Sequence, residues 1–189
     1  MQLRFLAAAA LLACSSAAAQ GPPDPSARIA AQRAAMERLA VMDGVWRGPA
    51  WTLGPQGRRA LTQTERVGTV LGGTVRMFEG RGYEADGSIG FNAVGVVSFD
   101  PASGNYTLTS WVMGYSGSFP LRLTEDGYVW EAPAGPGAVI RYTATISDGA
   151  WREIGERIAG DAPPVQVMEM NLRRVGDTAW PGGDPVPMR

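Results

Sequence analysis

The 189-residue chain contains no histidine and no lysine, and its single cysteine is Cys14. All 17 basic residues are arginines, whose guanidinium stays protonated and cannot act as a general base or form a Schiff base. These absences exclude a Ser-His-Asp triad, a Cys-His pair, a zinc site built on His or Cys, and a His-ligated haem. Acid–base chemistry is left to Asp, Glu and Tyr, and we expect neither a cofactor nor a metal ion.

Long basic runs are missing as well. No cluster exceeds two adjacent arginines, as at Arg58-Arg59 and Arg173-Arg174, and the formal net charge is −1. Proteins that bind nucleic acids make many phosphate contacts with clustered basic side chains. We therefore expect no nucleic-acid partner.

Residues 1–19 have the pattern of a secretory signal peptide. Arg4 precedes an apolar run, and Ala17, Ala18 and Ala19 precede Gln20 as a cleavage site would require. The run is too short to span a membrane as a stable helix. We expect a periplasmic or secreted protein. A second interpretation stays open, because residues 11–14 (Leu-Leu-Ala-Cys) resemble the lipobox of bacterial lipoproteins; we expect membrane contact only if Cys14 is lipidated.

The rest of the chain divides into three parts. Residues 20–42 are expected to form a proline-rich linker and one amphipathic helix, which Gly44 ends. Residues 43–176 are rich in Val, Thr, Ile, Tyr and Trp, and residues 177–189 look like a flexible tail. Short β-strands are predicted at residues 44–53, 59–71, 73–84, 89–99, 105–115, 118–124, 127–132, 138–147, 150–158 and 164–175.

The segments between these strands favour tight hairpins. They contain the pairs Asp86-Gly87, Asp126-Gly127 and Asp148-Gly149, whose residues tolerate positive φ. Consecutive hairpins form a meander, and closure of that meander removes its exposed edges. We therefore predict an all-β fold: an up-and-down antiparallel barrel of about 8–10 strands, preceded by one short helix.

Several short motifs resemble those of known proteins. The segment 43–48 (Asp-Gly-Val-Trp-Arg-Gly) is similar to the Gly-x-Trp motif that begins the first strand of lipocalins. Together with Leu71-Gly72-Gly73, Phe99-Asp100 with Tyr106 and Trp111, and the segment 167–174, it resembles a bacterial family of secreted lipocalin-like domains of unknown function. The resemblance spans residues 43–175 and implies a lipocalin-like barrel; it implies no activity.

The same resemblance implies how the barrel closes. In lipocalin-like folds the Gly-x-Trp indole lies against an arginine of the final strand, and the matching residues here are Trp46 and Arg174, with Arg173 as the alternative. A closed barrel also brings its first and last strands side by side. A guanidinium on an indole face contributes about 0.5–2 kcal/mol. We predict this stacked pair as the structural closure of the barrel.

Large apolar side chains and one carboxyl on the predicted strands are candidates for a ligand site. Rings and thioethers suit an apolar ligand, and an inward Glu would hold its polar end. The candidate ligand-binding residues are Met77, Trp111, Trp130, Tyr142, Glu153, Met168 and Met170. Alternation along a strand leaves open which charged residues point inward, including those of residues 150–158.

Three functions remain open on these grounds. The first is binding of a small apolar or lipid-like molecule inside the barrel. The second is an isomerase, cyclase or hydratase that uses Glu, Asp or Tyr, as some lipocalin-like barrels do, and the third is a structural envelope protein without a ligand. A cavity of roughly 300 Å3 or more favours binding. Paired buried carboxyls with shifted pKa favour an enzyme, and a filled interior favours the structural role.

Overall fold

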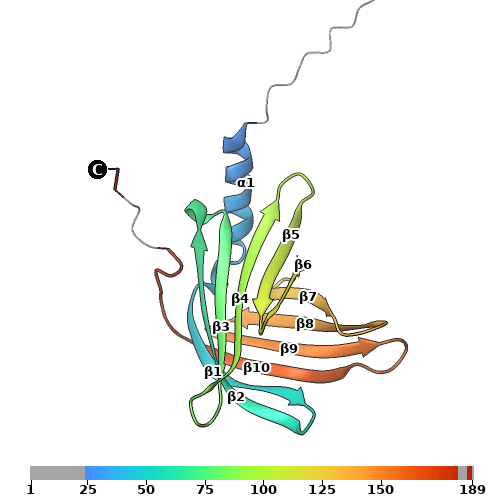
Figure 1. Cartoon of the computed structure of the whole chain (residues 1–189). Coiled ribbons are helices and arrows are strands. Elements are labelled where there is room, and N and C mark those ends of the chain that lie inside the picture. Colours follow the sequence, from blue (N-terminus) through green and yellow to red (C-terminus); the bar gives the residue numbers. More distant parts are fainter. Residues whose placement is uncertain (1–23, 183–186, 189) are drawn as a thin grey trace, which may run out of the picture.

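The computed structural model describes residues 24–182 and 187–188, which form a closed antiparallel β-barrel with one α-helix on its N-terminal side (Figure 1). The predicted fold class is confirmed. The expected leader at residues 1–19, Cys14, and the first part of the linker lie outside the described residues.

Ten strands make up the barrel, and each lies within a few residues of its predicted position. They are β1 (Gly44–Gly54), β2 (Gly57–Val70), β3 (Val75–Tyr83), β4 (Ile89–Asp100), β5 (Asn105–Val112), β6 (Tyr115–Leu123), β7 (Gly127–Pro133), β8 (Ala138–Ser147), β9 (Ala150–Ala159) and β10 (Val165–Gly176). Each strand pairs with its neighbours in sequence, and β1 pairs with β10. Short 3-10 turns, η1 (Ala40–Met42) and η2 (Leu71–Gly73), precede β1 and β3.

The predicted turn residues are where the chain reverses. Asp148 and Gly149 join β8 to β9 with φ values of 50° and 67°. Positive φ at both central residues is the geometry whose twist matches that of the flanking strands, and Asp and Gly adopt it at low cost. The Asp-Gly signals in the sequence therefore specify the meander locally.

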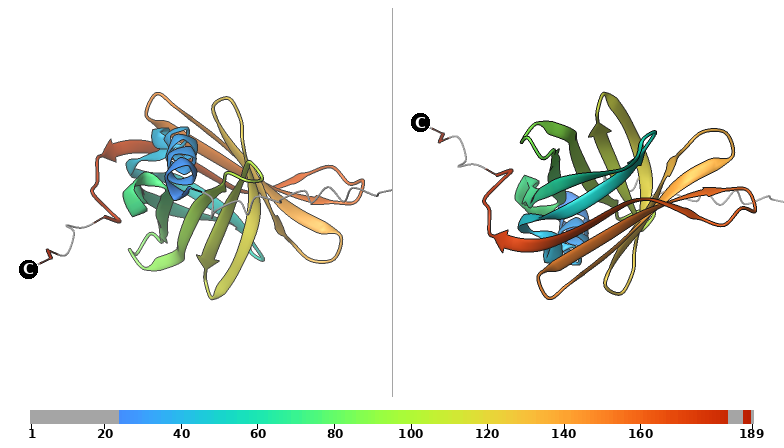
Figure 2. Two further views of the ribbon diagram at one scale, coloured as in Figure 1. Left: turned by 90° about the horizontal axis from the view of Figure 1, so that it is seen from above. Right: turned by 90° about the horizontal axis from the view of Figure 1, so that it is seen from below.

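Helix α1 (Pro25–Glu37) stands on one end of the barrel (Figures 1 and 2). Asp24 caps its N-terminus by accepting a hydrogen bond from the backbone N–H of Ser26, and Pro25 occupies the first turn. Only Ala35 and Met36 of the helix are buried. Within the described residues, no helix is both long and apolar enough to cross a membrane.

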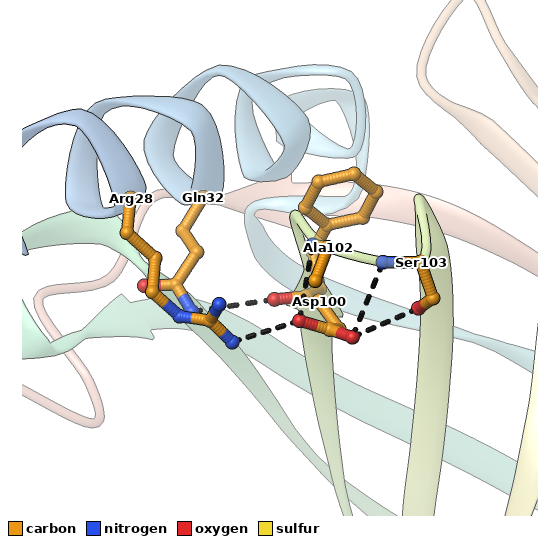
Figure 3. Close-up of polar contacts among 6 residues, drawn as sticks. Arg28, Gln32, Asp100, Ala102 and Ser103 are labelled. Carbon is orange, nitrogen blue, oxygen red and sulfur yellow. Dashed lines mark hydrogen bonds and ion pairs between the residues drawn. The ribbon is translucent and has the colours of Figure 1, made fainter. Parts of the chain in front are cut away.

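Polar contacts hold the exposed half of α1 against the turn between β4 and β5 (Figure 3). The guanidinium of Arg28 donates to Asp100 at 2.7 Å, and the amide of Gln32 donates to the Phe99 carbonyl at 3.3 Å. Asp100 also accepts hydrogen bonds from Ser103 and from the Ala102 N–H, which lower the pKa of its carboxyl. These contacts set the direction in which α1 leaves the barrel.

The C-terminal turn of α1 and η1 close this end of the barrel with apolar side chains. Trp46 is 1% exposed, and its indole N–H donates to the Met42 carbonyl at 2.8 Å. Its ring meets Trp151 edge to face, with centroids 5.7 Å apart. Further members of this core are Met36, Leu39, Val67, Val97, Tyr106, Ile146 and Leu172.

One arginine is buried in this apolar cluster, which we call the plug. Arg76 of β3 is 2% exposed, and its guanidinium binds both carboxylate oxygens of Asp43, at 2.8 and 2.9 Å. It also donates to the Met36 carbonyl at the end of α1. The two bonds to the Asp43 carboxylate and the bond to a carbonyl satisfy most of the N–H donors of the Arg76 guanidinium, as its burial requires. Arg76 therefore links α1, the start of β1 and β3.

The predicted stacking of Arg174 on Trp46 is wrong, although the two residues are partners in the β1–β10 register. The Arg174 guanidinium donates to the Asp43 carbonyl at 3.1 Å and pairs with Asp177 outside the barrel. Arg173, the alternative, is paired with Arg47 instead. Trp46 projects into the plug, where its ring packs edge to face with that of Trp151. The buried arginine at this end of the barrel is Arg76. Register alone did not predict the direction of a long side chain at a strand end.

Part of the expected flexible tail also lies on the barrel. The Arg66 guanidinium of β2 covers the ring of Trp180 at 4.9 Å from its centroid. Gly68 makes room for this segment, since a Cβ there would lie 2.0 Å from the Trp180 carbonyl oxygen. The barrel's outer surface is therefore covered at this point by residues beyond β10.

The plug generates a test of which arginine stabilises the closed end. We expect Arg76→Ala to lower the free energy of unfolding by about 3 kcal/mol, because it leaves the Met36 carbonyl and Asp43 without their donor. The matched control, Arg174→Ala, removes a half-exposed side chain and should cost about 1 kcal/mol or less. Urea denaturation followed by tryptophan fluorescence measures both, and an equal loss in the two variants would contradict this assignment.

Candidate ligand cavity inside the barrel

The barrel interior beyond the plug is not filled. A cavity of about 370 Å3 extends from Leu39 and Met42 at the plug to Leu53 and Phe91. Leu53 is 47% exposed, so the cavity reaches the surface at the end opposite α1. Most of the wall is apolar, with side chains that include Ala50, Leu61, Phe78, Val97, Leu108, Leu121, Ile140, Met168 and Met170.

Strand β9 places a carboxyl in this apolar wall. Trp151, Glu153 and Gly155 alternate along the strand and are buried, whereas Arg152 is exposed and pairs with Glu169 on the outside at 2.9 Å. The inward face of residues 150–158, which the sequence left open, is therefore the face that carries Glu153. Glu153 as a whole is 6% exposed, so its carboxyl is buried.

Glu153 is surrounded by neutral donors. The Tyr128 hydroxyl donates to its Oε2 at 2.6 Å. Burial raises the pKa of Glu153, and the polar hydrogens of Tyr128, Trp130 and Trp151 oppose that rise. Burial and the neighbouring Glu153 carboxylate raise the pKa of Tyr128 in turn. The buried Trp151 indole N–H is close enough to act on this carboxyl, but its geometry falls short of a hydrogen bond, which leaves one donor of the cavity wall available.

A second carboxyl, Glu65 of β2, lines the same cavity. Gln63, two residues before it on the inward face, donates to its Oε1 at 2.7 Å. The register pairs Glu65 with Gly80 of β3, and a Cβ at Gly80 would lie 2.6 Å from that Oε1. Any larger residue at position 80 would therefore displace the Glu65 carboxyl from its present place.

Burial raises the pKa of Glu65 to about 8, and the nearby Glu153 carboxyl adds to the shift. An isolated carboxylate in an apolar interior lacks the hydration that stabilises its charge. At neutral pH the Glu65 carboxyl is therefore largely protonated, so it can donate one hydrogen bond and accept others.

Aromatic rings form the wall between β7 and β9. Trp130 and Tyr142 stack with centroids 4.2 Å apart and an interplanar angle of 10°. Gly155 makes this possible, because a Cβ there would lie 2.6 Å from Met168 and 3.1 Å from Tyr142. Burial raises the pKa of Tyr142 to about 12, so its hydroxyl stays protonated. The rings thus present apolar faces and neutral donors.

Five of the seven candidate residues from the sequence line the cavity, and two do not. The five are Trp130, Tyr142, Glu153, Met168 and Met170. The placement of Met77 and Trp111 inside was wrong: Phe78 lines the cavity beside Met77, as do Ser110 and Val112 on either side of Trp111, so alternation turns both candidates outward. Trp111 is 51% exposed and lies in a surface depression with Met113 and Tyr115.

Four residues of the cavity wall were not predicted from the sequence as ligand candidates: Gln63, Glu65, Tyr128 and Trp151. Along β2 the inward residues Leu61, Gln63, Glu65 and Val67 alternate with Thr62, Thr64 and Arg66, so both faces are largely polar. Such a strand has no apolar stripe from which its inward face can be recognised. The spacing of Gln63 and Glu65 was visible, but only the register with Gly80 reveals a buried carboxyl.

No metal site emerges from the described residues, among which no group of three or more His, Cys, Asp or Glu side chains is arranged to hold an ion. Other strand carboxyls lie outside the barrel with arginine partners. Glu79 pairs with Arg66 and Arg81, and Glu131 pairs with Arg141 at 2.7 Å. The polar groups of the cavity wall are therefore two carboxyls, two tyrosine hydroxyls, the hydroxyls of Thr52 and Ser110, an amide and indole N–H groups.

Comparison with known proteins supports the barrel. One solved structure, titled "Crystal Structure of Rv2717c from M. tuberculosis", matches with a TM-score of 0.57 and 16% sequence identity over 75% of this chain and 97% of that one. No protein-family model matches the chain. No curated protein gives a significant match either. The comparison shows a shared fold, and membership of the lipocalin-like family stays a prediction.

The raised pKa of Glu65 predicts how stability depends on pH. Because the unfolded carboxyl ionises near pH 4.5 and the folded one near 8, its stabilising contribution is complete below about pH 4.5 and is lost as the pH rises through 8. The loss is at most about 1.4 kcal/mol per pH unit. Glu65→Gln should flatten this decline in urea denaturation between pH 5 and 8. The control Glu131→Gln, on the outer surface, should keep the wild-type slope; parallel curves for wild type and Glu65→Gln would refute the prediction.

Proposed function

We propose that the barrel binds a small, mostly apolar molecule in its interior and holds one polar end of that molecule at Glu65 and Glu153. The observation that carries this proposal is the unfilled cavity of about 370 Å3, whose wall is mostly apolar and includes a few polar groups. Ligand pockets typically have this size and combine apolar lining with a few placed polar groups. An empty interior also argues against a purely structural barrel, because voids reduce stability.

The arrangement of the polar groups supports the same proposal. Four polar residues are each 7% exposed or less, so water does not hydrate them freely: Gln63, Glu65, Tyr128 and Glu153. Buried polar groups without full hydrogen bonding are costly, and a ligand that completes their bonds recovers that cost. The unpartnered indole N–H of Trp151 is a further donor for such a ligand.

A second candidate function is acid–base catalysis on the bound molecule. Two carboxyls with raised pKa share one cavity, and the ionised form of either opposes ionisation of the other. Pairs of this kind supply a general acid and a general base at neutral pH. In such an enzyme Glu65 would donate a proton and Glu153 would accept one. If this holds, a small molecule that co-purifies with the Glu65→Gln variant is the unconverted substrate, whereas wild type converts the same molecule to a product. Mass spectrometry of the small molecules that co-purify with each protein would record this difference.

From the pattern of residues 1–19 alone, we further propose that the protein acts in the periplasm or outside the cell. The competing form, a lipoprotein anchored at Cys14, would place the same barrel at a membrane surface. Mass spectrometry of the mature N-terminus distinguishes a chain that begins at Gln20 from one that begins at a lipidated Cys14, and an intact Met1 in exported protein would contradict both.

Consecutive residues of β5 offer a matched test of binding. Ser110 lines the cavity, whereas Thr109 lies on the outer face and bonds Ser118 at 2.9 Å. Ser110→Phe should fill the cavity and weaken binding of an apolar fluorescent probe at least tenfold, while Thr109→Phe should change it less than twofold. Probe fluorescence titration with the full chain measures both affinities. A probe that binds wild type and both variants equally would place binding outside the barrel.

A further inference from the structure

The charges of the cavity are of one sign. Of the described residues that line it, Glu65 and Glu153 carry carboxyls and none is an arginine. The buried arginine of the plug, Arg76, is bound to Asp43 and to the Met36 carbonyl. The interior therefore holds two carboxyls and, among its lining residues, no positive side chain that would balance their ionised forms.

Several carboxyls outside the cavity have an arginine partner, whereas neither Glu65 nor Glu153 has one. The ion pairs among the described residues join arginines to Asp43, Glu79, Glu84, Asp100, Glu131, Glu169 and Asp177. Glu65 instead bonds Gln63, and Glu153 bonds Tyr128, both of them neutral donors. A buried carboxylate is strongly destabilised unless a cation is paired with it. A cation brought by a ligand would meet this need.

Aromatic rings line the same region. Trp130 stacks on Tyr142, and Tyr128 meets Trp151 edge to face with centroids 6.3 Å apart. All four rings line the cavity with the two carboxyls. The face of an aromatic ring attracts a positive charge, and most strongly where water is excluded. Carboxyls and ring faces together are complementary to an organic cation.

We propose that the molecule bound in the barrel carries a protonated nitrogen on an apolar body, with the nitrogen held between Glu65 and Glu153. This inference rests on the proposed binding function and names the class of its ligand: a cationic amphiphile such as an amine with a hydrocarbon or aromatic body. Met168, Met170 and the aliphatic wall accommodate that body.

Binding of a cation is coupled to the release of a proton. Glu65 is largely protonated below pH 8 in the free protein, and a bound cation favours its ionised form. The titratable groups that face Glu65 across the cavity are Glu153, Tyr128 and Tyr142; β1, β3 and β10 contribute none to the lining. Affinity for an amine should therefore rise as the pH increases from 5 to 8, by up to tenfold per unit, while affinity for a neutral ligand should stay level.

Three ligands of equal chain length test the proposal on the full protein. We would measure binding of decylammonium, 1-decanol and decanoate by calorimetry at pH 7.5. Decylammonium should bind at least tenfold more tightly than decanol, and decanoate most weakly. Glu65→Gln and Glu153→Gln should each abolish most of the preference for the amine over decanol, and a cooperative urea-denaturation curve for each variant shows that it is folded. The outer-surface control Glu131→Gln should keep the preference.

The outcomes separate the two proposals. Equal affinity for decylammonium and decanol, or a preference for decanoate, would overturn the cationic ligand while leaving the binding function intact. A preference for the amine that persists in both Gln variants would overturn the role of these carboxyls. If none of the three molecules binds, and the fluorescent probe does not bind either, the binding function itself fails.

Discussion

Hydrogen bonding between β1 and β10 closes a meander of ten strands into a barrel, and the rest of the structure depends on that closure. In a closed barrel each strand has one face inside and one outside, without an edge at which the alternation can change. A carboxyl on an inward position is then enclosed on all sides by other strands. Glu65 and Glu153 lie on β2 and β9, the neighbours of the closing pair, and face one cavity for this reason.

Glycine at inward positions keeps the interior open. Gly80 leaves room for the Glu65 carboxyl, and Gly155 leaves room for Tyr142 and Met168. A chain that maximised stability would fill this space with branched apolar side chains, since dense packing and neutral groups are favoured in a core. The plug at the other end follows that rule, with Trp46, Trp151 and Leu172 almost completely buried. The molecule thus combines a packed end with an open cavity whose mostly apolar wall includes a few polar groups.

The match to the mycobacterial structure is instructive at the level of fold. A TM-score of 0.57 at 16% identity means that the two chains share the barrel while most of their side chains differ. Fold and function are separable in this way, because the function depends on the inward side chains of a common scaffold. For the present protein those side chains are acidic and aromatic, and the cationic ligand that we propose is inferred from them alone.

The meander could be predicted from the sequence, because turn residues and strand alternation are local patterns. Asp148-Gly149 and the other turn pairs specify hairpins, and alternating strands between them need no distant partner to be recognised. Trp130, Tyr142, Glu153, Met168 and Met170 were also found as candidates from residue type and strand position. Which face of each strand lies inside became clear from the three-dimensional structure, in which Met77 and Trp111 point outward and Glu65 points inward. The same holds for the arginine of the plug, which is Arg76 and not Arg174. The direction in which a side chain points and the residues that it contacts depend on the register between strands that are distant in sequence. No local sequence pattern specifies that register.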